Sequence, residues 1–135
     1  MSVIKWRDSY NTGVSQFDQE HHKIIELIDA MYVALRDKLD REVTEKVCRE
    51  AIVYTEQHFA NEEQALISIN YPDLEEQMTE HSRMKKEVVK FQELIASNYT
   101  EGATGLYHFL RDWLINHILV IDKKYGPYLQ EVKGS

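Results

Sequence analysis

The stretch of the chain that decides its fold is residues 42–67, which read EVTEKVCREAIVYTEQHFANEEQALI. Its apolar side chains recur every three or four positions, as expected for a helix that buries one face. These apolar residues are Val47, Cys48, Ala51, Ile52, Phe59 and Leu66. The same period recurs in three further segments, at about 18–40, 72–96 and 106–125. The sequence therefore predicts an all-α protein.

Short segments rich in helix-breaking residues separate these helices. Pro72 disfavours a helical conformation at the residue before it and suits the first turn of a helix. Residues 97–105 contain two glycines and small polar side chains, so we expect a loop there. Gly126 and Pro127 are expected to end the last helix. Helices of about 20 residues joined by short loops pack as antiparallel neighbours, which predicts an up-down-up-down four-helix bundle.

A polar N-terminal arm, residues 1–17, precedes the first helix. We expect Asp18 to cap that helix by accepting hydrogen bonds from its free amides. The 135 residues fit one domain, 1–135, and 43% of them are hydrophobic, which is enough for a real core. The most apolar run, 113–121, is much shorter than the roughly 20 residues that span a membrane. Because no secretory signal opens the sequence, we expect a cytoplasmic protein that does not enter a membrane.

The charge balance is acidic, with 16 Lys and Arg residues against 23 Asp and Glu residues and a formal net charge of -7. Such a chain repels phosphate backbones and anionic lipids, so binding to nucleic acid or to a membrane surface is not expected. The one cysteine, Cys48, excludes an internal disulfide and lies on an apolar stripe, where we expect it to pack in the core.

Several polar residues interrupt the apolar stripes. They are His21, His58, Glu62, Gln77, His81, His117 and Asp122. Residues four apart on a helix project from the same face, so His58 and Glu62 can point at one position. The step from His117 to Asp122 is five residues, a rotation of roughly 140° on an ideal α-helix, so by spacing alone this is the weakest pair.

A single buried histidine is more often hydrogen-bonded within a core than bound to a metal, so none of these residues decides the matter alone. The combination of these residues favours a metal site, because each of four helices directs an imidazole or a carboxylate into one core. Without a cation, a bundle that buries these charges would be costly, whereas with one the cluster is a metal site. His22 and His108 are rotated away from the stripes and are expected at the surface.

Imidazole and carboxylate ligands without a thiolate suit iron, manganese or zinc. Four histidines and two carboxylates exceed what one tetrahedral ion uses, which indicates two ions. The ferritin-like carboxylate pattern needs a Glu-x-x-His pair on each of two helices, and no such pair occurs in this sequence. The predicted site is therefore richer in histidine than a carboxylate-type oxidase.

The motifs together resemble those of the hemerythrin family, specifically the single-domain bacterial hemerythrins. The resemblance covers nearly the whole chain and rests on Trp6, Gly13-Val14, Phe17–His21, His58–Glu62, Tyr71-Pro72, Trp113–Ile118 and Asp122. It implies a non-heme centre of two iron ions with an oxo or hydroxo bridge, which binds dioxygen reversibly. The implied role is oxygen carriage, storage or delivery to an oxygen-using enzyme, and peroxide or small anions are further ligands expected at the iron.

The resemblance also assigns roles to particular residues. His21 and His58 would hold the iron that keeps an open position, and His81 and His117 would hold the other iron. Glu62 and Asp122 would bridge the two ions. An apolar pocket around the bound dioxygen would be formed by Ile24, Ile25, Phe59, Trp113, Leu114 and Ile118.

Gln77 departs from the family pattern, which has a histidine four residues before His81. Three interpretations are open: Gln77 ligates the second iron through its amide oxygen, leaves an open position there, or weakens the occupancy of that ion. An amide oxygen is a harder and weaker ligand than an imidazole. We favour a second iron that is open or weakly filled, with faster autoxidation as a consequence.

Three functions follow as hypotheses. The first is a non-catalytic oxygen-binding protein. The second is a di-iron redox enzyme of the peroxidase or oxidase type, which the Gln77 departure makes more credible. The third is an oxygen or redox sensor, although such domains usually accompany signalling modules, which we do not expect here.

Overall fold

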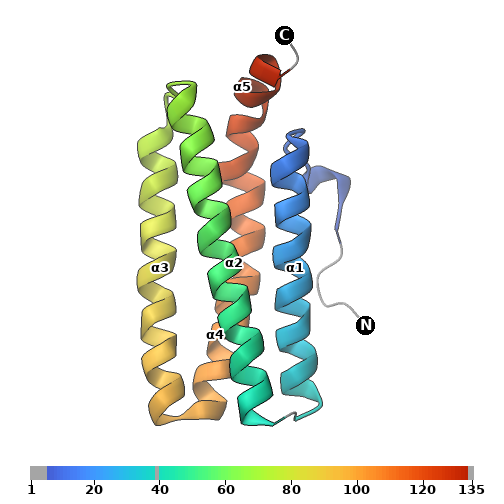
Figure 1. Ribbon diagram of the computed structural model, residues 1–135, viewed down its shortest axis with the longest axis vertical. Helices are drawn as coiled ribbons and strands as arrows, with labels where there is room; N and C mark the ends of the chain where they lie inside the picture. Colours follow the sequence, from blue (N-terminus) through green and yellow to red (C-terminus); the bar gives the residue numbers. More distant parts are fainter. Residues whose placement is uncertain (1–5, 39, 134–135) are drawn as a thin grey trace.

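The computed structural model describes residues 6–38 and 40–133. Within these residues the chain forms four helical rods that lie side by side and no strand, which confirms the antiparallel up-down-up-down bundle (Figure 1). A short 3₁₀ turn, η1 (Asp8–Tyr10), lies in the arm. The rods are α1 (Ser15–Arg36), α2 (Arg41–Ser68), α3 (Leu74–Ser97), and a fourth made of α4 (Tyr99–Asn116), η2 (His117–Asp122) and α5 (Lys123–Lys133) in succession.

The first helix begins three residues earlier than predicted, so Asp18 is not its cap. Val14 precedes the helix and provides no side-chain cap. The Asp18 carboxylate instead accepts hydrogen bonds from the Thr12 backbone N–H and hydroxyl, both at 2.8 Å, and from the Gly13 N–H at 3.1 Å. The prediction was wrong because it paired the Asp18 carboxylate with the free amides of the helix. The carboxylate instead holds the end of the arm against the first helical turn.

The predicted loop at 97–105 is also wrong, because α4 begins at Tyr99. Asn98 caps this helix through its side chain, which accepts from the N–H of Glu101. The glycines that suggested a loop lie where α4 packs on α3. A Cβ atom on Gly102 would lie 2.5 Å from the backbone nitrogen of Ile95, so glycine here allows two helices to approach closely.

Gly126 and Pro127 do not end the last helix, which continues as α5 to Lys133. Pro127 has no N–H and removes one helical hydrogen bond. The helix continues because residues on either side of the proline are anchored in the core: Tyr125 and Leu129 are both buried in the cluster at the start of α1 and the end of α2. Tertiary burial therefore outweighs the local signal to stop.

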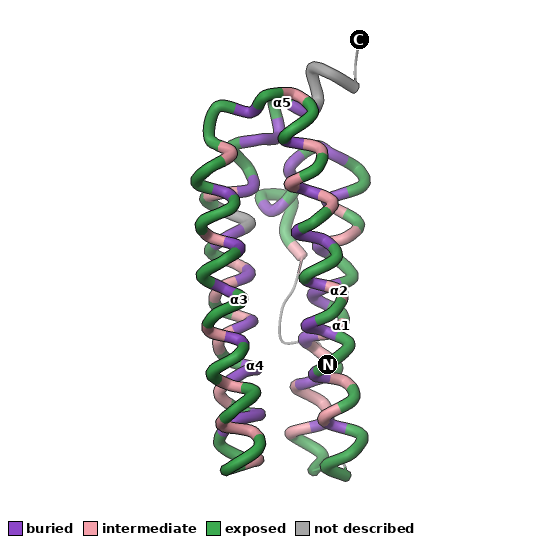
Figure 2. Tube along the Cα trace, turned by 60° about the vertical axis from the view of Figure 1, so that its left-hand side comes forward, coloured by how far each residue is buried: buried purple, intermediate pink, exposed green. Residues whose placement is uncertain are grey.

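The core consists of two clusters, and buried positions follow the inner faces of the rods (Figure 2). The smaller cluster contains Val14, Phe17, Leu66, Tyr71, Tyr125 and Leu129. The larger one occupies the rest of the bundle and includes Cys48, as predicted. Met78 of α3, whose spacing in the sequence matches the apolar stripe of that helix, is instead 40% exposed.

A polar layer separates the two clusters. On α1, His21 lies between Phe17 of the smaller cluster and Ile24 of the larger one. On α2, Glu62 lies in the same way between Phe59 and Leu66. The polar stripe residues therefore meet inside the bundle rather than at its surface.

Among the described residues, we find no helix with the length and apolar character needed to cross a membrane.

The close approach of α3 and α4 predicts different costs for two glycine substitutions. Gly102→Ala is expected to destabilise the protein by about 1–3 kcal/mol, because the new methyl group meets the rigid backbone of Ile95. Gly105→Ala is the matched control, since its Cβ meets the ring of Phe91, which can shift, and alanine regains about 1 kcal/mol of helix propensity. Urea denaturation compares the free energies of unfolding, and equal losses for the two variants would contradict this packing argument.

Candidate metal centre

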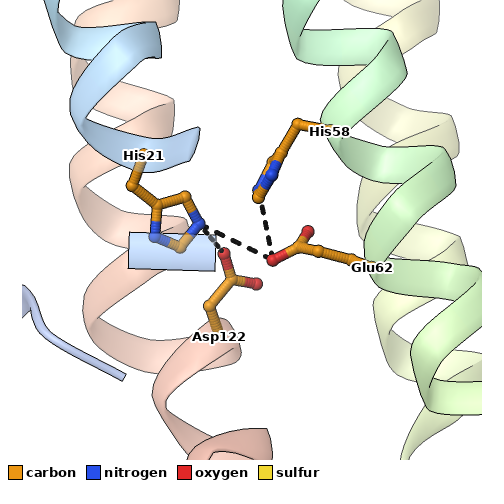
Figure 3. Close-up of side chains that lie close together, drawn as sticks. All are labelled: His21, His58, Glu62 and Asp122. Carbon is orange, nitrogen blue, oxygen red and sulfur yellow. Dashed lines mark ion pairs between the residues drawn. The ribbon is translucent and has the colours of Figure 1, made fainter. Parts of the chain in front are cut away.

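The polar layer brings together six of the side chains that the sequence singled out. All six are at most 3% exposed, and they come from α1, α2, α3 and η2. They are His21, His58, Glu62, His81, His117 and Asp122. Figure 3 shows four of them converging, His21 from α1, His58 and Glu62 from α2, and Asp122 from η2.

These side chains form two groups that share their carboxylates. The first group contains His21, His58, Glu62 and Asp122, and each residue offers one ligand atom within 4.8 Å of every other. The second group contains Glu62, His81, His117 and Asp122 with the same spacing. Each group thus offers two imidazoles and two carboxylates, a donor set that suits one metal ion.

Glu62 divides its two oxygens between the groups. Oε2 lies 3.2 Å from Nε2 of His58 and 3.6 Å from Nε2 of His21, whereas Oε1 lies 3.3 Å from Nε2 of His81. Asp122 is divided in the same way, with Oδ2 at 2.9 Å from Nε2 of His21 and Oδ1 at 2.7 Å from Nε2 of His117. Each carboxylate therefore presents one oxygen to each half of the site.

The pairing of His117 with Asp122 depends on an unusual turn. Residues 117–122 form η2, a π-helical turn, which closes with bonds between residues five apart rather than four. Residues that an ideal α-helix would separate by roughly 140° are thereby brought to the same side. The spacing that looked weakest in the sequence is explained by this local change of helix type.

The polar atoms that face the centre lack hydrogen-bond partners. The buried atoms without a partner include Nε2 of His21, His58, His81 and His117, Oε1 of Glu62 and Oδ2 of Asp122. The contacts of these nitrogens within the layer are with carboxylate oxygens at 2.7–3.6 Å. Each unsatisfied buried group costs about 1–3 kcal/mol. A pair of cations would satisfy them together, so the residues present fit a two-ion site.

Two further carboxylates, outside the two groups, orient two of the imidazoles. Nδ1 of His58 lies 2.5 Å from Oε1 of Glu20, and Nδ1 of His81 lies 2.8 Å from Oε2 of Glu63. Asn61 donates to the other oxygen of Glu20 at 3.1 Å. Such partners fix the ring and leave Nε2 free for a ligand role. Sequence reasoning missed Glu20 and Glu63, because each belongs to a different helix from the histidine that it contacts.

Tyr125 is a further residue that the sequence did not single out. Its hydroxyl donates to Oε2 of Glu62 at 2.5 Å, and its ring is fully buried. Burial and the negative charges of Glu62 and Asp122 raise the pKa of Tyr125 well above its usual range. The phenol therefore keeps its proton and holds the carboxylate in place.

The charges within the layer stabilise one another. Burial alone would raise the pKa of Glu62, but the positive charge of His58 and contacts with His21 and His81 hold it well below its usual range. Burial would lower the pKa of His58, yet Glu62 and Glu20 raise it to about 10. Without a metal the layer thus pairs ionised carboxylates with a protonated His58, and binding of a cation displaces protons.

Gln77 lies at the edge of the second group and is fully buried. Its amide nitrogen donates to the backbone oxygen of Ile121 and to Oδ1 of Asp122, both at 3.3 Å. Its amide oxygen has no hydrogen-bond partner.

The residues expected to form an apolar pocket are largely buried next to the layer. Ile24, Ile25, Phe59 and Leu114 belong to the larger core cluster, Trp113 packs against it, and the side chain of Ile118 lies outside those described. The Phe59 ring stacks on His81 with a centroid separation of 3.9 Å, and Trp113 stacks on His117 at 4.3 Å. These two rings therefore cover imidazoles of the second group.

The histidines predicted at the surface are exposed, as expected. His22 stacks on the indole of Trp6 with ring centroids 3.8 Å apart, so it helps to hold the arm. His108 lies on the outer face of α4.

The family model described as the hemerythrin HHE cation binding domain matches residues 12–129. The chain belongs to the hemerythrin family. This hemerythrin-family chain is 30% identical over 130 residues to a bacteriohemerythrin of Stenotrophomonas maltophilia, a match that covers 96% of this chain and 84% of the relative. A myohemerythrin of Riftia pachyptila is 28% identical over 124 residues, with 92% of each chain covered.

A solved structure agrees with these sequence relatives. The crystal structure of a wild-type hemerythrin superposes on this hemerythrin-family chain with a TM-score of 0.83 and 25% identity, covering 94% of this chain and 98% of that one. The resemblance inferred from the sequence is therefore confirmed for the family and for the fold.

The hydrogen bond from Tyr125 to Glu62 predicts a measurable contribution to stability. Tyr125→Phe is expected to cost the metal-free protein about 1.5–3 kcal/mol, because a bond to a buried charged group is lost. Tyr71→Phe is the matched control: Tyr71 is buried in the same cluster, but its hydroxyl has no partner, so its removal should be nearly neutral. Urea denaturation after chelator treatment measures both, and a larger loss for Tyr71→Phe would contradict the assignment.

Proposed function

We propose that this chain binds dioxygen reversibly at a pair of non-heme iron ions and serves in oxygen carriage, storage or delivery. The proposal rests on the two buried groups of four donor residues that share Glu62 and Asp122. Several donor atoms that point into the centre have no hydrogen-bond partner. Imidazole and carboxylate donors without thiolate suit iron. Relatives named bacteriohemerythrin and myohemerythrin support the same choice.

The protein side chains would divide the work of holding the ions. His21 and His58 would bind one ion, and His81 and His117 the other. Glu62 and Asp122 would hold both ions at a fixed separation, because each presents one oxygen to either group. When bound, the iron pair would supply an open coordination position and the electrons that dioxygen takes up.

The surrounding residues would keep this arrangement rigid. Glu20 and Glu63 hold the Nδ1 atoms of His58 and His81, so Nε2 of each ring is directed to the centre. The phenol of Tyr125 keeps its proton and donates a hydrogen bond to Glu62, which restrains that carboxylate. A preorganised set of protein ligands changes little in shape as oxygen binds and leaves, which favours reversible oxygen binding.

Apolar residues around the layer would exclude water. Ile24, Phe59 and Leu114 are at most 3% exposed and belong to the larger cluster beside the site. An apolar shell limits access of solvent and protons to a metal site. Dioxygen would then leave unchanged more often than it is reduced irreversibly.

The central experiment is anaerobic loading of the chelator-treated protein with ferrous salt, followed by exposure to air. We expect about two iron ions per chain and a visible absorption band that appears with oxygen and disappears under argon. Retention of no iron would contradict the proposal. Irreversible oxidation with steady turnover of added peroxide would favour a redox enzyme instead.

The shared carboxylates predict that one substitution removes both ions. Glu62→Gln removes a negative charge from both groups, so we expect iron retention to fall below about one ion per chain. His108→Gln is the control, because this exposed histidine belongs to neither group and should retain the full content. Iron analysis after gel filtration measures both variants, and full retention by Glu62→Gln would show that this carboxylate does not bridge the ions.

A further inference from the structure

The position of Gln77 places an amide beside the second group of donors. Gln77 lies one helical turn before His81 on α3, so both side chains project from the same face. The residue is fully buried, and its amide nitrogen lies 3.3 Å from Oδ1 of Asp122. The same oxygen lies 2.7 Å from Nε2 of His117, so the amide adjoins the atoms that face the second ion.

The hydrogen bonds of Gln77 determine how its amide is oriented. A primary amide has two N–H donors and one oxygen acceptor. The nitrogen donates to the carbonyl of Ile121 and to the carboxylate of Asp122, both of which accept only. The reverse orientation would place the amide oxygen against these two oxygens, which is unfavourable. The nitrogen is therefore held by the π-helical turn, and the oxygen is left for another partner.

The amide oxygen of Gln77 has no such partner within the protein. It is buried and accepts no hydrogen bond, as is also true of the Nε2 atoms of His81 and His117 in the second group. A buried acceptor of this kind costs about 1–3 kcal/mol if nothing satisfies it. The oxygen belongs to the same amide group whose nitrogen contacts Asp122 of the second group.

From these observations we infer that Gln77 supplies Oε1 as a fifth protein ligand to the ion held by Glu62, His81, His117 and Asp122. The inference rests on the proposed function, since it requires that an ion pair is bound. The amide oxygen of Gln77 has no other partner within the protein, so it is available when the ion arrives. This differs from our sequence-based preference for an open or weakly filled second position.

The assignment makes the two halves of the site unequal. The first ion has two imidazole nitrogens and two carboxylate oxygens as protein ligands, whereas the second has these and an amide oxygen as well. The first ion therefore keeps more positions for a small molecule. An amide oxygen is a weaker donor than imidazole, so the second ion is held less tightly than it would be with histidine at this position.

The test is a titration of the chelator-treated full-length protein with cobalt(II), which needs no oxygen chemistry and whose visible spectrum reports the ligand set. Wild type is expected to bind two equivalents. Gln77→Leu keeps a similar volume but has no oxygen, so its first equivalent should bind as in wild type and the Kd of the second should rise at least tenfold. Gln77→His should bind the second equivalent more tightly than wild type.

Two further variants separate ligation from other roles. Gln77→Glu keeps an oxygen but loses both N–H donors, and should retain the second equivalent. Thr44→Val is the matched control, because Thr44 is a buried residue without a hydroxyl partner near the start of α2, and it should bind cobalt as wild type does. If the metal-free Gln77→Leu protein does not fold, Gln77→Asn, which is shorter by one methylene, should show the same loss of the second equivalent.

The outcomes distinguish this inference from the proposed function. Two tightly bound equivalents and an unchanged spectrum in Gln77→Leu would overturn the ligand assignment while leaving the ion pair intact. Loss of the second equivalent in Gln77→Glu would also overturn it, because the N–H donors rather than the oxygen would then matter. Failure of the wild-type protein to bind two ions would overturn the proposed function itself.

Discussion

Two carboxylates, Glu62 and Asp122, are buried completely in the middle of the bundle, and the surrounding structure compensates for their charge. Removing an ionised carboxylate from water is costly unless it is paired and hydrogen-bonded. Imidazoles from all four rods lie within 3.6 Å of the two side chains, and Tyr125 donates to one of these carboxylates. A pair of cations would complete this compensation, because several of the atoms that face the centre have no hydrogen-bond partner.

This requirement also shapes the fold around the site. The polar layer divides the apolar core into a short cluster at one end and a long cluster that fills the rest. Each of two imidazoles is held by a carboxylate from the neighbouring helix, Glu20 for His58 and Glu63 for His81. These contacts tie α1 to α2 and α2 to α3 at the level of the layer. The register of the helices and the geometry of the site are thus specified by the same interactions.

Prediction from the sequence was most accurate where local pattern and tertiary packing agree. The second helix, expected at 42–67, runs from Arg41 to Ser68, because its apolar period is uninterrupted. Prediction failed where glycine or proline residues are accommodated in helices by tertiary packing. Gly102 forms part of a helix because it packs against the backbone of Ile95, and Pro127 lies within a helix whose burial at Tyr125 outweighs one lost hydrogen bond.

The helical class, the apolar faces and the polar residues that meet inside the bundle could all be read from the amino-acid sequence. Periodicity along one chain carries this information, since a helix places residues three and four apart on one face. How the metal-ligand donors are shared between the two groups became visible only in the folded protein. The division of each carboxylate between two groups and the orientation of the Gln77 amide arise from contacts between helices, and the π-helical turn that aligns His117 with Asp122 departs from the α-helical period. Such contacts have no period along the chain, so the sequence does not display them.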